Sequence, residues 1–179
     1  VDHSDIRPWP PASWTVPLGR FAKQDVKQPS RDGQAVGRIR IPALGVDATM
    51  VSGTSLPSLA KGPGVLRSGV LPGQKGNATV AAHRTTYGAW GRNFDRLRYG
   101  DKIYTYVPGV GNAVYEVRGR SVVSPKSVSV TRSGDGVRLT LSTCHPVYSS
   151  DYRLVIQAEM ISGDWLDASV NRSDWKTYS

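Results

Sequence analysis

The chain has 179 residues, of which 39% are hydrophobic and 21% are charged, values that indicate one globular domain and exclude a disordered or fibrous chain. Its 23 basic and 14 acidic residues give a net charge of +9, which suits an anionic surface such as a lipid headgroup layer or a cell wall. Because the arginines are scattered, without a zinc-ligand spacing or an aromatic nucleic-acid motif, we predict no nucleic-acid binding.

Residues 1–36 are predicted to form a tether or brace. Five of the twelve prolines fall before residue 30, interleaved with Trp9, Trp14 and Phe21. Proline lacks the amide hydrogen that helices and sheets use, so this segment should be extended. Its large aromatic side chains favour packing against the main domain. No apolar stretch approaches the ~18 residues that span a bilayer, so we expect any membrane anchor to lie outside this chain.

From Gly37 onward, short runs of alternating or β-branched residues are separated by Gly, Pro, Asn and Asp. Such runs predict strands. We place them at residues 37–41, 48–52, 78–83, 102–107, 113–123, 137–143 and 152–160, with short helical turns at 56–60 and 93–97. Seven or eight short strands without a long amphipathic helix predict an all-β fold, either a closed barrel or a sandwich.

The chain has one cysteine, Cys144, which excludes an internal disulfide. Taken alone, it could be a small buried core residue. However, it follows the predicted strand 137–143, and a thiol at a strand end can meet a substrate. If this strand pairs antiparallel with the next, Arg153 returns to the same end. A guanidinium beside a thiol favours the thiolate and can donate to an oxyanion, which points to acyl transfer.

A cysteine nucleophile also needs a group that accepts and returns a proton. The histidines are His3, His83 and His145. His3 lies in the tether, and His145 adjoins Cys144 in a strand-like context, where neighbouring side chains point to opposite faces. His83, at the end of the predicted strand 78–83, is therefore preferred. The sequence alone does not show whether the three strand ends converge.

The run Thr140-Leu141-Ser142-Thr143-Cys144 resembles the signature of the sortase family, in which Thr-Leu, a variable residue and Thr-Cys end a barrel strand. Arg153, nine residues later, stands where a sortase has its arginine. The run Ala81-Ala82-His83-Arg84 resembles the segment that leads to the catalytic histidine. Two blocks most resemble class E, namely His83-Arg84-Thr85-Thr86-Tyr87-Gly88 and Cys144-His145-Pro146.

This resemblance implies a closed sortase-type β-barrel of about eight strands with short helices or 3-10 turns. It covers a catalytic domain at residues 37–162, followed by a C-terminal extension at 163–179. It implies that Cys144 is the nucleophile, that His83 is the acid and base, and that Arg153 holds the peptide and the oxyanion. Thr143, Tyr87 and Ala82 are expected to bind the substrate. No metal and no cofactor are implied.

The function implied by the resemblance is cleavage of a Leu-Pro/Ala-x-Thr-Gly-like sorting signal between Thr and Gly, with transfer of the acyl group to an amine of a peptidoglycan precursor or a pilin. We expect a monomer at the extracytoplasmic face of the cell membrane. Two alternatives stay open. One is an L,D-transpeptidase-like wall enzyme, although its Ser-His-Gly-Cys-like block is absent. The other is a basic wall-binding β-domain in which Cys144 is structural.

Overall fold

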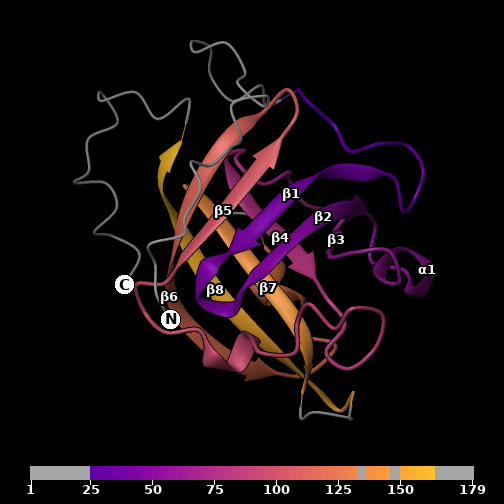
Figure 1. Ribbon diagram of the computed structural model, residues 1–179, viewed down its shortest axis with the longest axis vertical. Coiled ribbons are helices and arrows are strands. Elements are labelled where there is room, and N and C mark those ends of the chain that lie inside the picture. Colours follow the sequence, from indigo (N-terminus) through magenta and orange to yellow (C-terminus); the bar gives the residue numbers. More distant parts are fainter. Residues whose placement is uncertain (1–24, 133–135, 146–149, 164–179) are drawn as a thin grey trace.

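A computed structural model describes residues 25–132, 136–145 and 150–163, and its strands close into a barrel (Figure 1). The strands are β1 (Ala35–Ile41), β2 (Val46–Ser52), β3 (Gly64–Val65), β4 (Gly76–Ala81), β5 (Lys102–Val107), β6 (Gly111–Val123), β7 (Val137–His145) and β8 (Tyr152–Gly163). Their order around the barrel is β1-β2-β3-β4-β7-β8-β6-β5, and β5 pairs with β1 to close it. The predicted all-β barrel is confirmed.

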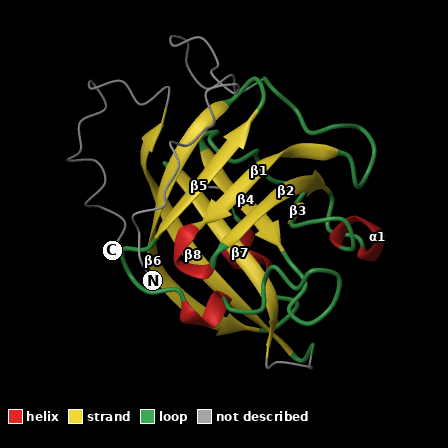
Figure 2. Ribbon diagram, in the orientation of Figure 1, coloured by secondary structure: helices red, strands yellow, loops and turns green. Residues whose placement is uncertain are grey.

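Helices are single turns within the connections between strands (Figure 2). They are η2 (Pro42–Leu44), α1 (Leu56–Leu59), η3 (Phe94–Arg96) and η4 (Val128–Thr131). The sequence predicted α1 and η3, but not η2, η4 or the two-residue strand β3. Across the described part of the chain, no helix has the length and apolar character needed to cross a lipid bilayer.

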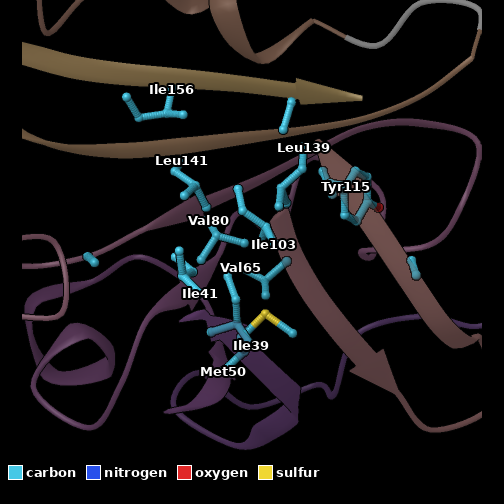
Figure 3. Close-up of a cluster of buried hydrophobic side chains, with 14 of the residues drawn as sticks. Ile39, Ile41, Met50, Val65, Val80, Ile103, Tyr115, Leu139, Leu141 and Ile156 are labelled. Atoms are coloured by element: carbon cyan, nitrogen blue, oxygen red, sulfur yellow. The ribbon is translucent and has the colours of Figure 1, made fainter. Parts of the chain in front are cut away.

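The barrel interior is filled by the apolar side chains of alternate strand positions (Figure 3). This follows from the period of two, which turns every second side chain of a strand inward. The largest fully buried side chains include Ile39, Ile41, Met50, Ile103, Leu139, Leu141 and Ile156. Burying each such side chain contributes about 1.5–3 kcal/mol. The hydroxyl of Tyr115, also fully buried, accepts a hydrogen bond of 2.7 Å from the Gly73 amide.

The parallel pair β4 and β7 positions the candidate site. Its register runs from Gly76 opposite Val137 to Ala81 opposite Ser142. Near the first of these ends, the segment that contains η4 crosses the outer face, where the Asn77 amide donates to the Val130 carbonyl at 2.8 Å. These contacts cover one end of the pair, and the chemically reactive residues lie at the other.

The described part of the predicted tether, residues 25–36, contacts the barrel. Gln28 donates from Nε2 to the Leu66 carbonyl at 2.8 Å, and Gln74 donates from Nε2 to the Val26 carbonyl at 2.9 Å. The tryptophans on which the brace was predicted lie outside the described residues, as does most of the C-terminal extension at 163–179.

Candidate active site

Cys144 is the penultimate residue of β7 and lies directly opposite Arg153 on β8. Residues that are paired in this way project to the same face of the sheet, with Cβ atoms about 4.5–5.5 Å apart. The prediction that the strand stops at Thr143 is wrong by two residues, because pairing with β8 continues until His145 lies opposite Tyr152. The thiol is therefore held by a rigid ladder, and it is partly exposed.

His83 lies at the same end of the barrel, two residues beyond the end of β4, whose last residue, Ala81, lies opposite Ser142 of β7. The Ala82 amide still donates to the Ser142 carbonyl at 3.0 Å, which keeps the chain beside β7 up to that point. The strand predicted to include His83 ends at Ala81 instead. Since parallel strands end at the same edge of a sheet, His83 is brought to the edge that carries Cys144. The convergence that the sequence left open is thus present in the fold.

The His83 residue is half-buried. Its Nε2 is enclosed and has no hydrogen-bond partner among the described residues. The Tyr87 ring lies with its centroid 5.5 Å from that of His83, at an angle of 42°. The Gly91 amide donates to the His83 carbonyl at 2.9 Å, which fixes the backbone of the histidine. The His83 backbone is thus fixed, and its enclosed Nε2 is left without a partner by the described residues.

Arg153 is held by two backbone carbonyls, one just before β8 and one at its first residue. Its Nη1 donates to the Ser150 carbonyl at 2.9 Å and to the Tyr152 carbonyl at 3.0 Å. Both bonds use one nitrogen of a guanidinium that carries five N–H donors. The group is therefore oriented by the two carbonyls and keeps donors with which to hold a substrate oxygen.

Thr143 and Ala82 lie under the site rather than at its surface, with exposed fractions of 2% and 4%. The Thr143 hydroxyl donates to the Ala82 carbonyl at 2.9 Å, linking the last residues of β7 to the segment before His83. A Cβ added at Gly91 would lie 2.5 Å from the Thr143 Oγ1, so this close approach requires glycine. Their burial supports a positioning role, and their predicted contact with a substrate stays a prediction.

Tyr87 is exposed over 63% of its surface and has a φ of 46°, in the left-handed region that aromatic residues rarely adopt. Gly88 and Ala89 follow with φ values of 79° and 46°. With Asp47 and Trp90, Tyr87 lines a hollow of about 430 Å³ next to the loop after β4. The loop thus presents Tyr87 to solvent beside His83, as its predicted role in substrate binding requires.

Arg84 was not singled out as a candidate site residue by the sequence, although its side chain is buried next to the Cys144 end of β7. An arginine in a loop is ordinarily exposed, so composition gave no sign of this burial. The one available signal was its place directly after His83.

The described residues contain no group of three or more His, Cys, Asp or Glu side chains that could hold a metal ion. The side chains that the fold brings to this end of the barrel offer a thiol, an imidazole and guanidinium groups. This set suits nucleophilic attack on a carbonyl, with proton transfer and stabilisation of an oxyanion.

Comparisons with known proteins agree with this geometry. The sortase domain family matches residues 39–161. Sortase SrtE2 of Streptomyces coelicolor is 32% identical over 152 residues, which cover 74% of this chain and 58% of that protein. The solved structure of sortase E from Streptomyces avermitilis is 30% identical, with a TM-score of 0.66, and the match covers 74% of this chain and 91% of that one.

A structure of Clostridium perfringens sortase C with the C-terminal cell wall sorting motif is also similar. Its identity is 28% and its TM-score 0.65, and the match covers 74% of this chain and 73% of the other. The resemblance to class E predicted from the sequence is confirmed by the two Streptomyces sortases.

Proposed function

The chain belongs to the sortase family, and from this premise we propose that it is a cysteine transpeptidase that cleaves a sorting signal and joins the new acyl end to an amine. The observation that carries the proposal is the pairing of Cys144 with Arg153 at the edge of the barrel that also holds His83. A nucleophile, an oxyanion donor and a proton carrier at one edge are the groups that acyl transfer needs.

In the proposed mechanism, the Cys144 thiolate attacks the threonine carbonyl of the Thr-Gly bond in a Leu-Pro/Ala-x-Thr-Gly-like signal. Arg153 donates hydrogen bonds to the oxyanion that forms. As the C–N bond breaks, protonated His83 gives its proton to the leaving glycine amine, which leaves a thioester on Cys144. An acceptor amine then attacks the thioester and loses a proton to His83, and the thiolate is released.

His83 is preferred over His145 as the proton carrier because of what each ring contacts. His145 Nδ1 lies 3.0 Å from Arg84 Nη1, and an arginine can only donate. Nδ1 of His145 is therefore occupied as an acceptor. Nε2 of His83 has no partner in the described part of the chain. The histidine chosen on strand alternation is thus also favoured by hydrogen bonding.

We place the signal peptide along the outer face of β4 and β7. Small side chains, Ala81 and Ser142, are paired there immediately before the Cys144 end. Further along, Thr140 donates to Asn77 at 2.8 Å beneath the η4 segment, which limits how far a peptide can extend. A sorting motif is the ligand named for the similar sortase C structure, and we extend this class of ligand to the present chain.

The acceptor that we propose is an amine of a peptidoglycan precursor or a pilin, reached at the extracytoplasmic face of the cell membrane. The net charge of +9 supports work beside an anionic wall. We propose an anchor outside the given chain, and a monomer. The family match favours this activity over an L,D-transpeptidase-like enzyme or a wall-binding domain with a structural cysteine.

The proposed function is tested by incubating the protein with a panel of Leu-x-x-Thr-Gly peptides, with and without short amines, and following the products by mass spectrometry. The panel should vary proline and alanine at the second position. We expect cleavage after threonine and formation of the amide with the added amine. A peptide in which the Thr-Gly amide is N-methylated serves as a control for background hydrolysis. No product with any peptide would refute the proposal.

A further inference from the structure

The residue after the proposed acid and base is an arginine that the fold buries. The Arg84 side chain is 4% exposed. Removing a charge from water is costly unless hydrogen bonds and an opposite charge compensate for it. A buried arginine one residue from His83 therefore needs a structural reason, and its contacts supply one.

Arg84 binds two segments of the chain at once, β7 and η3. Nη1 donates to the Cys144 carbonyl at 2.9 Å and lies 3.0 Å from His145 Nδ1, both on β7. Nη2 forms an ion pair with Asp95 on η3, at 3.3 Å. The planar guanidinium can make these contacts together because its donors point in fixed, divergent directions.

These bonds bracket His83 on both sides. On the preceding side, Thr143 of β7 donates to the Ala82 carbonyl at 2.9 Å. On the following side, the Arg84 guanidinium binds the Cys144 carbonyl. Ala82, before His83, is thus bonded to Thr143, and Arg84, after His83, is bonded to Cys144. The pairing of β4 with β7 stops at Ala81, so beyond that point these side-chain bonds continue the alignment.

The same guanidinium also sets the state of His145. Since arginine has no acceptor, Nδ1 of the neutral His145 ring must carry the lone pair and Nε2 must carry the hydrogen. The ring beside the nucleophile is therefore held in one tautomer, with one nitrogen engaged. This prevents it from competing with His83 for the proton through that nitrogen.

We propose that Arg84 is a positioning residue, which holds the Cys144 peptide in line with His83 and fixes the tautomer of His145. This inference rests on the proposed function, because alignment matters only if His83 and Cys144 act together. This role depends on the directions of the guanidinium donors and not only on the positive charge of Arg84. A misplacement of about 1 Å between reacting groups can lower a rate by about 10²-fold.

The test compares Arg84→Met and Arg84→Lys with Arg67→Met. Arg67 is a matched control, because its Nη1 also binds a backbone carbonyl, that of Pro29 at 3.1 Å, and a carboxylate, that of Asp32 at 3.0 Å. Arg67 follows β3 and lies near the Gly76 end of β4, away from His83, since Leu66 donates to the Thr79 carbonyl. All assays are run well below the lowest melting temperature in the set.

We expect Arg84→Met to lower kcat for peptide cleavage by about 10²-fold with little change in KM, because the peptide still binds while the reacting groups are misaligned. Arg84→Lys should recover only part of kcat, since a point charge cannot span the Cys144 carbonyl and Asp95. Arg67→Met should keep both constants. Wild-type kcat in folded Arg84→Met would overturn the proposal. If Arg84→Met fails to fold, a wild-type kcat in Arg84→Lys would overturn the proposal instead.

Nitrogen-15 NMR of the histidine rings gives a readout that needs no substrate. At a pH where His145 is neutral, its Nδ1 should resonate as an unprotonated nitrogen in the wild type and shift in Arg84→Met, but not in Arg67→Met. A protonated Nδ1 on neutral wild-type His145 would refute the contact. If the wild type transfers no acyl group to any amine, the proposed function fails, while this spectrum still decides whether Arg84 holds His145.

Discussion

The two ends of the β4 and β7 pair treat their polar groups differently. At the Gly76 end, the Asn77 amide donates to the Val130 carbonyl and its oxygen accepts from Thr140, at 2.8 Å in each case. At the Ala81 end, Nε2 of His83 and Nε of Arg84 are enclosed without a hydrogen-bond partner among the described residues. Leaving such a group unpaired costs about 1–3 kcal/mol.

The backbone shows the same contrast. The left-handed φ values of Tyr87 and Ala89 belong to the loop that follows His83. Strain of this kind persists where the surrounding structure holds it, and it gathers at sites of function. One parallel ladder thus joins an end where the Asn77 side chain is hydrogen-bonded to an end where His83 and Arg84 each keep an unpaired nitrogen. Between the two ends, the Thr79 hydroxyl is also unpaired among the described residues. Substitutions at the two ends should therefore affect different measurements.

The largest effect is expected from Cys144→Ala, which should abolish cleavage and transfer because the nucleophile is lost. The fold should persist, since the partly exposed thiol contributes little packing. Activity is measured by peptide turnover and folding by circular dichroism. Turnover retained in this variant would contradict the assignment of the reactive end.

Loss of the partners of Cys144 should lower the rate without abolishing it. We expect His83→Ala to reduce kcat/KM by about 10²–10⁴-fold and Arg153→Ala by about 10²–10³-fold. Arg153→Lys should recover poorly, because the planar fork is replaced by a point charge. The measurement is steady-state turnover, and full recovery with lysine would show that only charge is needed at this position.

The covered end should respond in stability instead. Asn77→Ala removes the donor to the Val130 carbonyl and the acceptor for Thr140, so we expect the free energy of unfolding to fall by about 1–3 kcal/mol. Turnover per folded molecule should stay at the wild-type level. Denaturant unfolding and turnover in parallel check both statements. A large loss of turnover in folded Asn77→Ala would contradict the claim that this end of the pair affects stability and not activity.

Glu116 on β6 belongs to a third region, on a strand that β8 separates from the β4 and β7 pair. Its carboxyl allows the effect of acid on the stability of the fold to be measured separately from the effect of acid on activity. A hydrogen bond from Lys102, followed by the charge of Arg118, holds the pKa of its carboxyl below the ordinary value of 4.5. A lowered folded pKa gives stability that is present above pH 4.5 and is lost as the pH falls through the folded pKa.

In Glu116→Gln, the free energy of unfolding should therefore fall less steeply with acid below about pH 4.5 than in the wild type. Arg118 Nη1 lies 2.6 Å from the Glu116 carboxylate, so some stability at neutral pH should also be lost. Urea unfolding at a series of pH values is the measurement. If the free energy of unfolding falls equally steeply with acid in Glu116→Gln and in the wild type, the Glu116 carboxylate does not contribute to the acid dependence of stability.

The smallest expected effect concerns selectivity. Tyr87 is exposed beside His83, and we expect Tyr87→Ala to change the ratio of rates on peptides with alanine and proline at the second position of the signal. The melting temperature should change little. Competition between the two peptides in one reaction measures the ratio directly. Equal losses on both peptides would mean that the ring only packs the loop.

The sequence predicted those parts of the molecule that depend on local pattern. The strand predicted at residues 137–143 is confirmed within β7, where Leu139 and Leu141 are fully buried. Strand β3 has two residues, Gly64 and Val65, too few for alternation to appear. The exact ends of β4 and β7 were misjudged because they depend on pairing with other strands rather than on the local residues.

The site shows the same limit. Cys144, His83 and Arg153 were selected by residue type and position, and the fold brings them to one edge. Arg84 was missed because its burial depends on the Cys144 carbonyl and on Asp95, which are distant in the chain. The bond from the Thr143 hydroxyl to the Ala82 carbonyl was not predicted either, and the predicted contact of Thr143 with a substrate stays a prediction. Such tertiary contacts leave no pattern in a single sequence.

The central claim is that Cys144 forms a thioester with the threonine of a sorting signal. It is tested most directly by intact-mass spectrometry of the protein after brief incubation with a Leu-Ala-x-Thr-Gly peptide and quenching in acid. We predict a mass increase equal to the acyl fragment, located on Cys144 by peptide mapping and removed when an amine is added. Peptide cleavage without this adduct in the wild type, or the same adduct in Cys144→Ala, would contradict the account.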